Sequence, residues 1–209
     1  HLACLALDIK KNDYVITTPT TFLSTANSIL FVGAKPVFVD INPKNYCIDL
    51  LKMEKKIKEF SKKSKKIKAA IITDYAGQPC DWKKIKMLSK KFNFQTINDN
   101  CHSLGSKYYN NQKYAVKYAD IVTHSFHPVK IVTTGEGGNI ATNNKSIFDK
   151  VSLLRTHGVR KNLKLSRKYG NWYYQMENLG YNYRLADINA ALGTSQISKI
   201  KKFIKKRKF

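Results

Sequence analysis

Short β-branched segments alternate with longer segments in which apolar residues recur at helical spacing. Met53, Ile57 and Phe60, for example, fall on one face of a lysine-rich helix predicted over residues 52–66. This alternation is typical of α/β layers, because neighbouring parallel strands need a crossover connection. The predicted strands are residues 14–18, 36–41, 69–73, 94–97, 121–125 and 138–141, and the predicted helices are 21–32, 52–66, 82–91 and 147–157. We therefore expect an α/β fold with a mostly parallel sheet flanked by helices.

The last quarter of the chain follows a different pattern. Residues 158–180 are polar and aromatic without a clear period, which predicts a loop. From Ala186 one amphipathic helix is predicted to run to the end, with apolar residues such as Ile188 and Ile204 on one side. Its final segment, KIKKFIKKRKF, has the composition of a membrane-surface helix, but its apolar face continues to the last residue. We therefore expect a helix that is cut short rather than one that lies on a membrane.

The charge balance raises the question of nucleic-acid binding. The 209 residues include 38 basic and 14 acidic side chains, for a net charge of +24. Only five of the basic residues are arginines, the type that favours bidentate contacts with phosphates and bases. The lysines are spread over the whole chain, so we interpret them as solvated helix faces and predict no nucleic-acid partner.

Cysteine usage and hydropathy indicate a cytoplasmic location. The four cysteines stand far apart, without the paired spacing of a metal site or a disulfide framework. No apolar run approaches the ~18 residues of a membrane span, and no signal peptide is visible. The first residues, HLACLAL, have the pattern of a helix interior, so we expect that an N-terminal segment is missing.

The stretch HSFHPVKIVTTGEGGNI, residues 124–140, holds one lysine between an apolar strand and a glycine cluster. Lys130 is a candidate nucleophile toward carbonyl groups, although in so lysine-rich a chain a solvated loop lysine is the ordinary alternative. Asp99 follows another predicted strand, and such a carboxylate can keep a pyridine nitrogen protonated. Ser125 can donate a hydroxyl to a phosphate, and Phe22 can stack on a flat ring. Taken singly, these three residues are also consistent with a cap, a strand-end hydroxyl and a core side chain.

Six blocks of the sequence, in order, resemble the DegT/DnrJ/StrS family of sugar-nucleotide aminotransferases, in the fold-type I class of pyridoxal-phosphate enzymes. They extend over essentially the whole chain, which makes the resemblance far more specific than a lone serine and lysine motif. The blocks are TTPTTFLSTANSILFVGAKPVFVDI, DYAGQPCDW, NDNCHSLGSKY, HSFHPVK with GEGGNIATN, LLRTHGV, and GYNYRLADINAALGTSQI.

The resemblance implies a role for each matching residue and pyridoxal 5'-phosphate as the cofactor. Lys130 would hold the cofactor covalently, and Asp99 would pair with the pyridine nitrogen. Ser125 would bind the phosphate and Phe22 would cover the ring. Two further residues match the family. His102 would lie near the phenolic oxygen of the cofactor or near the lysine, and Asn182 would reach the phosphate bound by a neighbouring subunit. A homodimer with a shared active site is therefore implied.

The resemblance also implies a reaction. DYAGQPCDW and HSLGS look most like the branch that transfers an amino group from glutamate to the C4 keto group of a UDP-linked 4-keto-6-deoxy sugar. Other keto sugars linked to GDP or dTDP are the alternative within the family. Residues 1–209 would form a partial cofactor-binding large domain, without the N-terminal phosphate turn and the C-terminal small domain, so this chain alone is expected to be inactive or unstable.

This chain departs from the usual family sequence beside Asp99, and two alternative functions remain to be weighed. Asn98 stands where the family usually has a glutamate, and Asn100 and Cys101 follow Asp99 in place of small residues. Sugar dehydratases of the same family replace the lysine by histidine, so Lys130 argues against that chemistry. A non-catalytic basic binding fragment is the third hypothesis, supported only by the expected missing ends.

Overall fold

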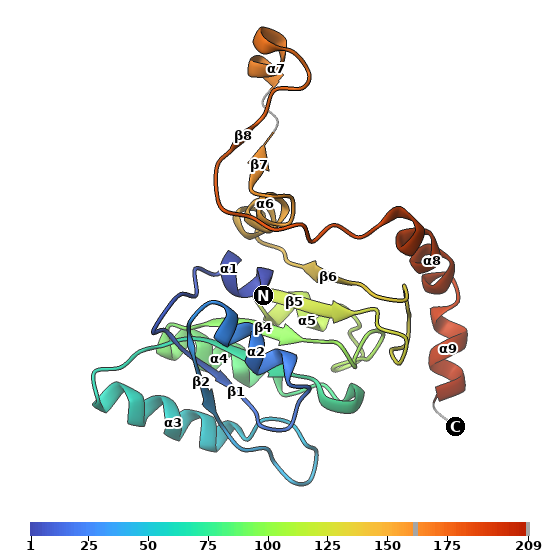
Figure 1. Cartoon of the computed structure of the whole chain (residues 1–209). Helices are drawn as coiled ribbons and strands as arrows, with labels where there is room; N and C mark the ends of the chain where they lie inside the picture. The colour runs from blue at the N-terminus through green and yellow to red at the C-terminus, as the bar shows by residue number, and fades with distance from the viewer. Residues whose placement is uncertain (161–162, 208–209) are drawn as a thin grey trace.

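The computed structural model describes residues 1–160 and 163–207, and its centre is a six-stranded sheet (Figure 1). The strand order is β2-β1-β3-β4-β5-β6, in which the first five strands are parallel and β6 is antiparallel to β5. The α/β fold and the mostly parallel sheet are thus confirmed. The strands are β1 (Tyr14–Thr17), β2 (Lys35–Phe38), β3 (Ile67–Thr73), β4 (Gln95–Asp99), β5 (Ile121–Ser125) and β6 (Gly138–Ala141).

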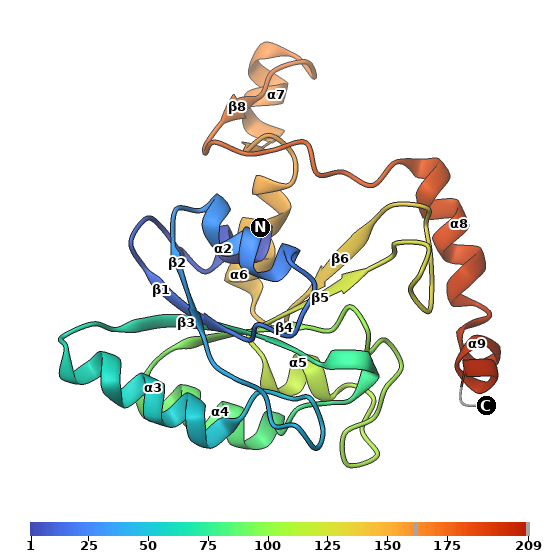
Figure 2. The ribbon, with the colours of Figure 1, turned by 60° about the horizontal axis from the view of Figure 1, so that its bottom comes forward.

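Helices cover both faces of this sheet (Figures 1 and 2). One face is covered by α1 (Leu2–Ala6), α2 (Ser24–Phe31) and α6 (Lys145–Leu154). The other is covered by α3 (Leu50–Lys62), α4 (Trp82–Phe92) and α5 (Tyr114–Tyr118). Neighbouring residues of β3 enter opposite layers: Ile71 packs with the first group and Ile72 with the second. Burial on both faces explains why this strand is continuously apolar instead of alternating.

Capping residues set the helix boundaries and shift them from the predicted ones. The Asp49 carboxylate accepts hydrogen bonds from the Leu51 and Lys52 amides, so α3 begins at Leu50; the helix ends at Lys62, and both bounds lie earlier than predicted. Asp81 caps α4 in the same way, through the Lys84 amide. The helix predicted over residues 21–32 begins only at Ser24, because the Thr21 hydroxyl bonds to those of Thr25 and Thr73 and holds the preceding segment in a loop.

The predicted alternation of strands and helices stops after β5. Residues 126–137 form a turn, not a helix, and β6 returns beside β5 with Ser125 opposite Gly138. A Cβ on Gly138 would lie 2.5 Å from the His124 carbonyl oxygen, so this close approach needs glycine. The glycine cluster therefore reverses the chain at the sheet edge.

The C-terminal arm is defined as residues 155–160 and 163–207; its first part projects away from the sheet, and its last part returns beside the sheet edge at β6 (Figure 1). The loop predicted over residues 158–180 is wrong in part, because it contains β7 (Val159–Arg160), α7 (Leu163–Tyr169) and β8 (Gln175–Met176), with β7 antiparallel to β8; residues 161 and 162 lie outside the described residues. These elements are too short to leave a periodic signal in the sequence.

The single helix predicted from Ala186 is two helices, α8 (Asp187–Ile197) and α9 (Ile200–Arg207), while residues 208 and 209 are not described. The Asn189 side chain of α8 donates to the Thr134 carbonyl in the turn before β6, which anchors the arm beside the sheet. None of the helices in the described ranges combines the length and the hydropathy that crossing a membrane requires.

Candidate active site

Four segments meet where the parallel strands end. The chain moves outward from β1 to β2 and then crosses back to β3, so the sheet has a switch point between β1 and β3. In open α/β sheets, ligands bind at the carboxyl ends of the strands near such a point. Here these ends carry residues 18–25, 74–80, 99–106 and 125–130.

Asp99, the last residue of β4, is a nearly buried carboxylate, 9% exposed. Its Oδ2 accepts hydrogen bonds from Thr25 Oγ1 at 2.7 Å and Thr73 Oγ1 at 3.3 Å, and Oδ1 accepts one from the Cys101 amide at 3.3 Å. All three donors are neutral. Among the described residues, no cationic side chain forms an ion pair with this carboxylate. Its negative charge is therefore available to a cationic ligand.

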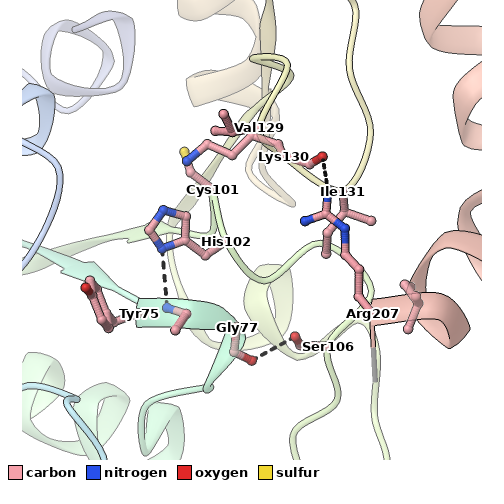
Figure 3. A pocket seen from close by; sticks show the side chains of 11 residues that line it. Tyr75, Gly77, Cys101, His102, Ser106, Val129, Lys130, Ile131 and Arg207 are labelled. Carbon is pink, nitrogen blue, oxygen red and sulfur yellow. Dashed lines mark hydrogen bonds between the residues drawn. The ribbon is translucent and has the colours of Figure 1, made fainter. Parts of the chain in front are cut away.

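Lys130 lies in the turn after β5 and is half-buried. Its amide donates to the His127 carbonyl at 2.9 Å, and its own carbonyl accepts from Arg207 Nη2 at 2.9 Å. Figure 3 shows the amine end of the side chain directed toward Cys101 and His102. The lysine is thus held by its backbone while its amine faces the loop that follows Asp99.

One cavity of about 380 Å³ brings together five of the six predicted site residues. Ser125, at the end of β5, accepts a hydrogen bond on Oγ from the His127 amide at 3.3 Å. Phe22, in the loop before α2, is 63% exposed and forms part of the cavity wall. The five residues are Phe22, Asp99, His102, Ser125 and Lys130.

Asn182 is the sixth predicted residue, and the structure does not bring it to this cavity. It pairs with Thr156 in an isolated antiparallel bridge within the C-terminal arm, and it is exposed. A residue that serves a neighbouring subunit need not approach the cavity of its own chain. Its assignment stays a prediction.

His102 has a defined protonation pattern. Burial is the main cause that lowers its pKa, the Lys130 charge acts in the same direction, and Asp99 opposes them. Nδ1 accepts a hydrogen bond from the Ala76 amide at 3.3 Å, so the neutral ring carries its proton on Nε2. In Figure 3 this second nitrogen faces Cys101 and the Lys130 amine. A neutral His102 can therefore offer an N–H donor beside the lysine.

Sequence reasoning did not identify the residues that hold Asp99 in place. Thr25 lies in the first turn of α2 and Thr73 at the end of β3, and the only signal for either was its hydroxyl group. The structure also explains Asn98, where the family usually has a glutamate. Asn98 Nδ2 donates to the buried Asp74 carboxylate at 3.1 Å, so a glutamate there would place a second negative charge beside it.

The residues of the cavity fit the predicted cofactor. Pyridoxal phosphate presents a protonatable ring nitrogen, an aldehyde and a phosphate, and the cavity supplies an unpaired carboxylate, an amine and a hydroxyl. Asp99, Lys130 and Ser125 would hold these three groups in that order, and Phe22 provides an apolar surface for the ring.

Comparisons with solved structures support the fold and the cofactor class. The structure is similar to the Helicobacter pylori aminotransferase PseC, which is involved in the biosynthesis of pseudoaminic acid, with a TM-score of 0.82, 34% identity, and coverage of 96% of this chain and 51% of that one. It is also similar to the putative sugar aminotransferase Spr1654 of Streptococcus pneumoniae in its PMP form, with a TM-score of 0.86, 28% identity, and coverage of 99% and 56%. These neighbours share the fold and belong to the predicted class of cofactor enzymes.

Two curated relatives carry more specific names. The UDP-4-amino-4,6-dideoxy-N-acetyl-beta-L-altrosamine transaminase of Campylobacter jejuni serotype O:23/36 is 43% identical over 209 residues, which is 99% of this chain and 51% of that protein. The GDP-perosamine synthase of Escherichia coli O157:H7 is 36% identical over 208 residues, 100% of this chain and 52% of that protein. This chain thus spans about half the length of the curated relatives it matches. Because the sequence profile of the family matches residues 1–209, the chain belongs to the DegT/DnrJ/EryC1/StrS aminotransferase family.

Proposed function

We propose that the protein containing this chain is a pyridoxal-phosphate aminotransferase. It transfers an amino group from glutamate to the C4 keto group of a UDP-linked 4-keto-6-deoxy sugar. The observation that carries the proposal is the shared cavity of Asp99, Ser125 and Lys130, which matches the three polar ends of the cofactor. Residues 1–209 would supply most of the large domain, and an N-terminal segment and a small domain would complete the protein.

The choice of nucleotide rests on the relatives. A UDP-linked substrate is favoured because the Campylobacter jejuni transaminase is 43% identical to this chain. The GDP-perosamine synthase, at 36% identity, makes a GDP-linked keto sugar the second candidate. Both candidates use the same amine-transfer chemistry, so they differ only in the groups that recognise the nucleotide and the sugar.

The roles of the chain's own residues follow from their positions. When bound, the cofactor supplies an electron sink for the carbanion that amine transfer requires. Asp99 keeps the ring nitrogen cationic, and the Thr25 and Thr73 hydroxyls fix its carboxylate. Lys130, once its amine is free and neutral, would carry a proton from the amino donor's α-carbon to the cofactor in the first half of the cycle, and would carry a proton from the cofactor to the C4 carbon of the sugar in the second half. His102, neutral with its proton on Nε2, donates a hydrogen bond beside that amine.

A homodimer with a shared active site is part of this proposal. In the C-terminal arm, large apolar side chains are exposed, among them Trp172 at 75%, Leu179 at 78% and Ile188 at 82%. Asn182 lies on the same arm and would reach the phosphate in the partner's cavity.

The net charge of +24 suits phosphorylated ligands. The four free cysteines fit the reducing cytoplasm, where we place the protein.

The experiment compares the purified full-length gene product with Lys130→Ala. Borohydride reduction followed by peptide mass spectrometry is expected to find the cofactor on Lys130. Glutamate-dependent amination should fall by about 10⁴-fold in the variant, because the lysine is both the attachment point and the proton carrier. Assays with UDP-linked and GDP-linked 4-keto-6-deoxy sugars decide between the two substrates.

Lys145→Ala is the matched control, since Lys145 is an exposed lysine on α6 that pairs with Asp149 outside the cavity. It should keep wild-type activity and cofactor attachment. Wild-type levels of both in Lys130→Ala would refute the proposal.

A further inference from the structure

Asp74 is a fully buried carboxylate that accepts five hydrogen bonds, directly after β3. Its Oδ1 accepts from the Cys80 amide at 2.9 Å and from Trp82 Nε1 at 2.8 Å. Its Oδ2 accepts from Asn98 Nδ2 at 3.1 Å, Asn100 Nδ2 at 3.0 Å and the Tyr114 hydroxyl at 2.6 Å. The carboxylate therefore joins residues of β4, α4 and α5 to the end of β3.

The backbone of Asp74 makes further contacts with the same region. Its amide donates to the Asp99 carbonyl at 3.1 Å, and its carbonyl accepts from Ser103 Oγ at 2.9 Å and the Gly77 amide at 3.3 Å. One residue thus fixes two loops, residues 75–80 after β3 and residues 100–103 after β4.

These contacts surround both Asp99 and His102. Asn98 and Asn100 are the neighbours of Asp99 on either side, and both donate to Asp74. The first loop also carries the Ala76 amide that bonds to His102 Nδ1, and the second loop carries His102 itself. A change at Asp74 would therefore release the supports of both groups together.

We propose that Asp74 is a positioning residue that holds Asp99 and His102 in the arrangement that amine transfer requires. This inference rests on the proposed function. Asp74 lines none of the cavities that contain Lys130, so it acts through the two residues rather than on the substrate.

The donors around Asp74 match an acceptor carboxylate. The Trp82 indole and the Cys80 backbone amide can only donate, and both asparagines direct their NH₂ groups at the carboxylate. Burial raises the pKa of Asp74, while hydrogen bonds from Cys80, Tyr114, Trp82 and Asn98 act in the opposite direction. Replacement by asparagine would turn one acceptor oxygen into a donor NH₂ that faces other donors, which breaks part of the network with little change in volume.

The test compares Asp74→Asn with Asp120→Asn in the full-length gene product loaded with cofactor. Asp120 is a matched control because its carboxylate also joins β4 to β5, through the Thr96 amide at 2.8 Å, the Thr96 hydroxyl and Lys86, but at the opposite end of the strands. The readouts are kcat and KM for amine transfer, and the pKa of His102 from an NMR titration in which its signal is assigned by its absence in His102→Gln.

Asp74→Asn is expected to lower kcat by about 100-fold, as misplacement of reacting groups by about 1 Å does, with less than about a threefold change in KM. The pKa of His102 should rise toward its ordinary value, since the loosened loops bury the ring less. Asp120→Asn should change neither quantity. Unchanged kcat and unchanged His102 titration in a folded Asp74→Asn protein would overturn the inference, and so would equal changes in Asp120→Asn.

Tyr114→Phe provides a second variant, and it decides alone if Asp74→Asn does not fold. It keeps the buried ring and removes one donor to Asp74. We expect a smaller fall in kcat, about tenfold, and a rise of the His102 pKa. No change in either quantity would overturn the inference. If the wild-type protein transfers no amine, the proposed function fails, while the His102 titration still tests the positioning role.

Discussion

The sheet body, residues 1–154, and the C-terminal arm bury their side chains in opposite ways. The sheet body packs apolar residues such as Ile72 and Ile121, both 0% exposed, into layers on the two faces of the sheet. In the described part of the arm, only Gly158 and Gly193 are buried. Figure 2 shows the part with α7 and β8 projecting from the sheet, and α8 and α9 lying beside the sheet edge. The sheet body thus forms a core from its own residues, whereas the arm needs another surface to cover its apolar side chains.

The sharpest way to break this comparison is to truncate one isoleucine in each region. Ile72→Ala should lower the free energy of unfolding by about 2–5 kcal/mol, because it leaves a cavity between β3 and the α3, α4 and α5 layer. Ile188→Ala, at a side chain that is 82% exposed, should change it by less than about 0.5 kcal/mol at protein concentrations where the chain is monomeric. Denaturant unfolding followed by circular dichroism measures both. Equal losses would show that the arm has a core that the structure lacks.

The next prediction concerns what covers the arm. Trp172→Ser and Leu179→Ser should each weaken self-association by about 2 kcal/mol, roughly 30-fold, if these side chains are buried against a second copy. Sedimentation equilibrium gives the dissociation constants. Met87→Ser is the control, since Met87 is 64% exposed on α4 of the sheet body and should not affect association. A comparable loss with Met87→Ser would place the interface on the sheet body instead.

The smallest expected effect is a pH dependence of stability in the sheet body. Burial is the main cause that lowers the pKa of His124, and its hydrogen bond to Asn139 Oδ1, at 2.7 Å, acts in the opposite direction. A lowered pKa means that the folded state resists protonation. Stability is therefore fully present above the unfolded value of about 6.5 and is lost as the pH falls through the folded pKa.

Thermal unfolding between pH 7.5 and pH 5 tests this effect. His124→Gln should reduce the loss of Tm on acidification, because it removes the group that resists protonation. Asn139→Ala should increase that loss, because it removes a contact that favours the protonated ring. A slope that is the same in both variants and in the wild type would exclude His124 as a source of the pH dependence.

Part of the site could be predicted because its chemistry resides in residue types at strand ends. Asp99, Ser125 and Lys130 follow apolar segments whose period identifies strands, and parallel strands place their carboxyl ends at one edge. Thr25, Thr73 and Asp74 could not be predicted in this way. The two threonines bond to Asp99 across 74 and 26 positions of the sequence, and Asp74 bonds to Asn98 across 24, while a threonine or aspartate near a strand end is too common to identify one partner.

The direction of β6 and the interruption between α8 and α9 show a second limit. The side-chain pattern of a strand does not encode its direction in the sheet. The sequence therefore predicts a strand over residues 138–141, but not the antiparallel pairing that Gly138 allows. The apolar spacing from Ile188 to Ile204 is continuous across the break between α8 and α9, so the pattern predicts one helix. Contacts of α8 with the turn before β6, through Asn189, contribute to where the arm lies.

Local pattern and side-chain chemistry were therefore enough to predict the α/β fold and to single out a lysine, an aspartate and a serine suited to one cofactor, and the resemblance of six sequence blocks pointed to the family. Tertiary structure decided which groups hold them: the two threonines on Asp99, the Ala76 amide on His102, and the Asp74 network behind both. The physical reason is that periodicity reports which face of an element is buried, whereas hydrogen-bond geometry depends on segments that meet only after the sheet has formed.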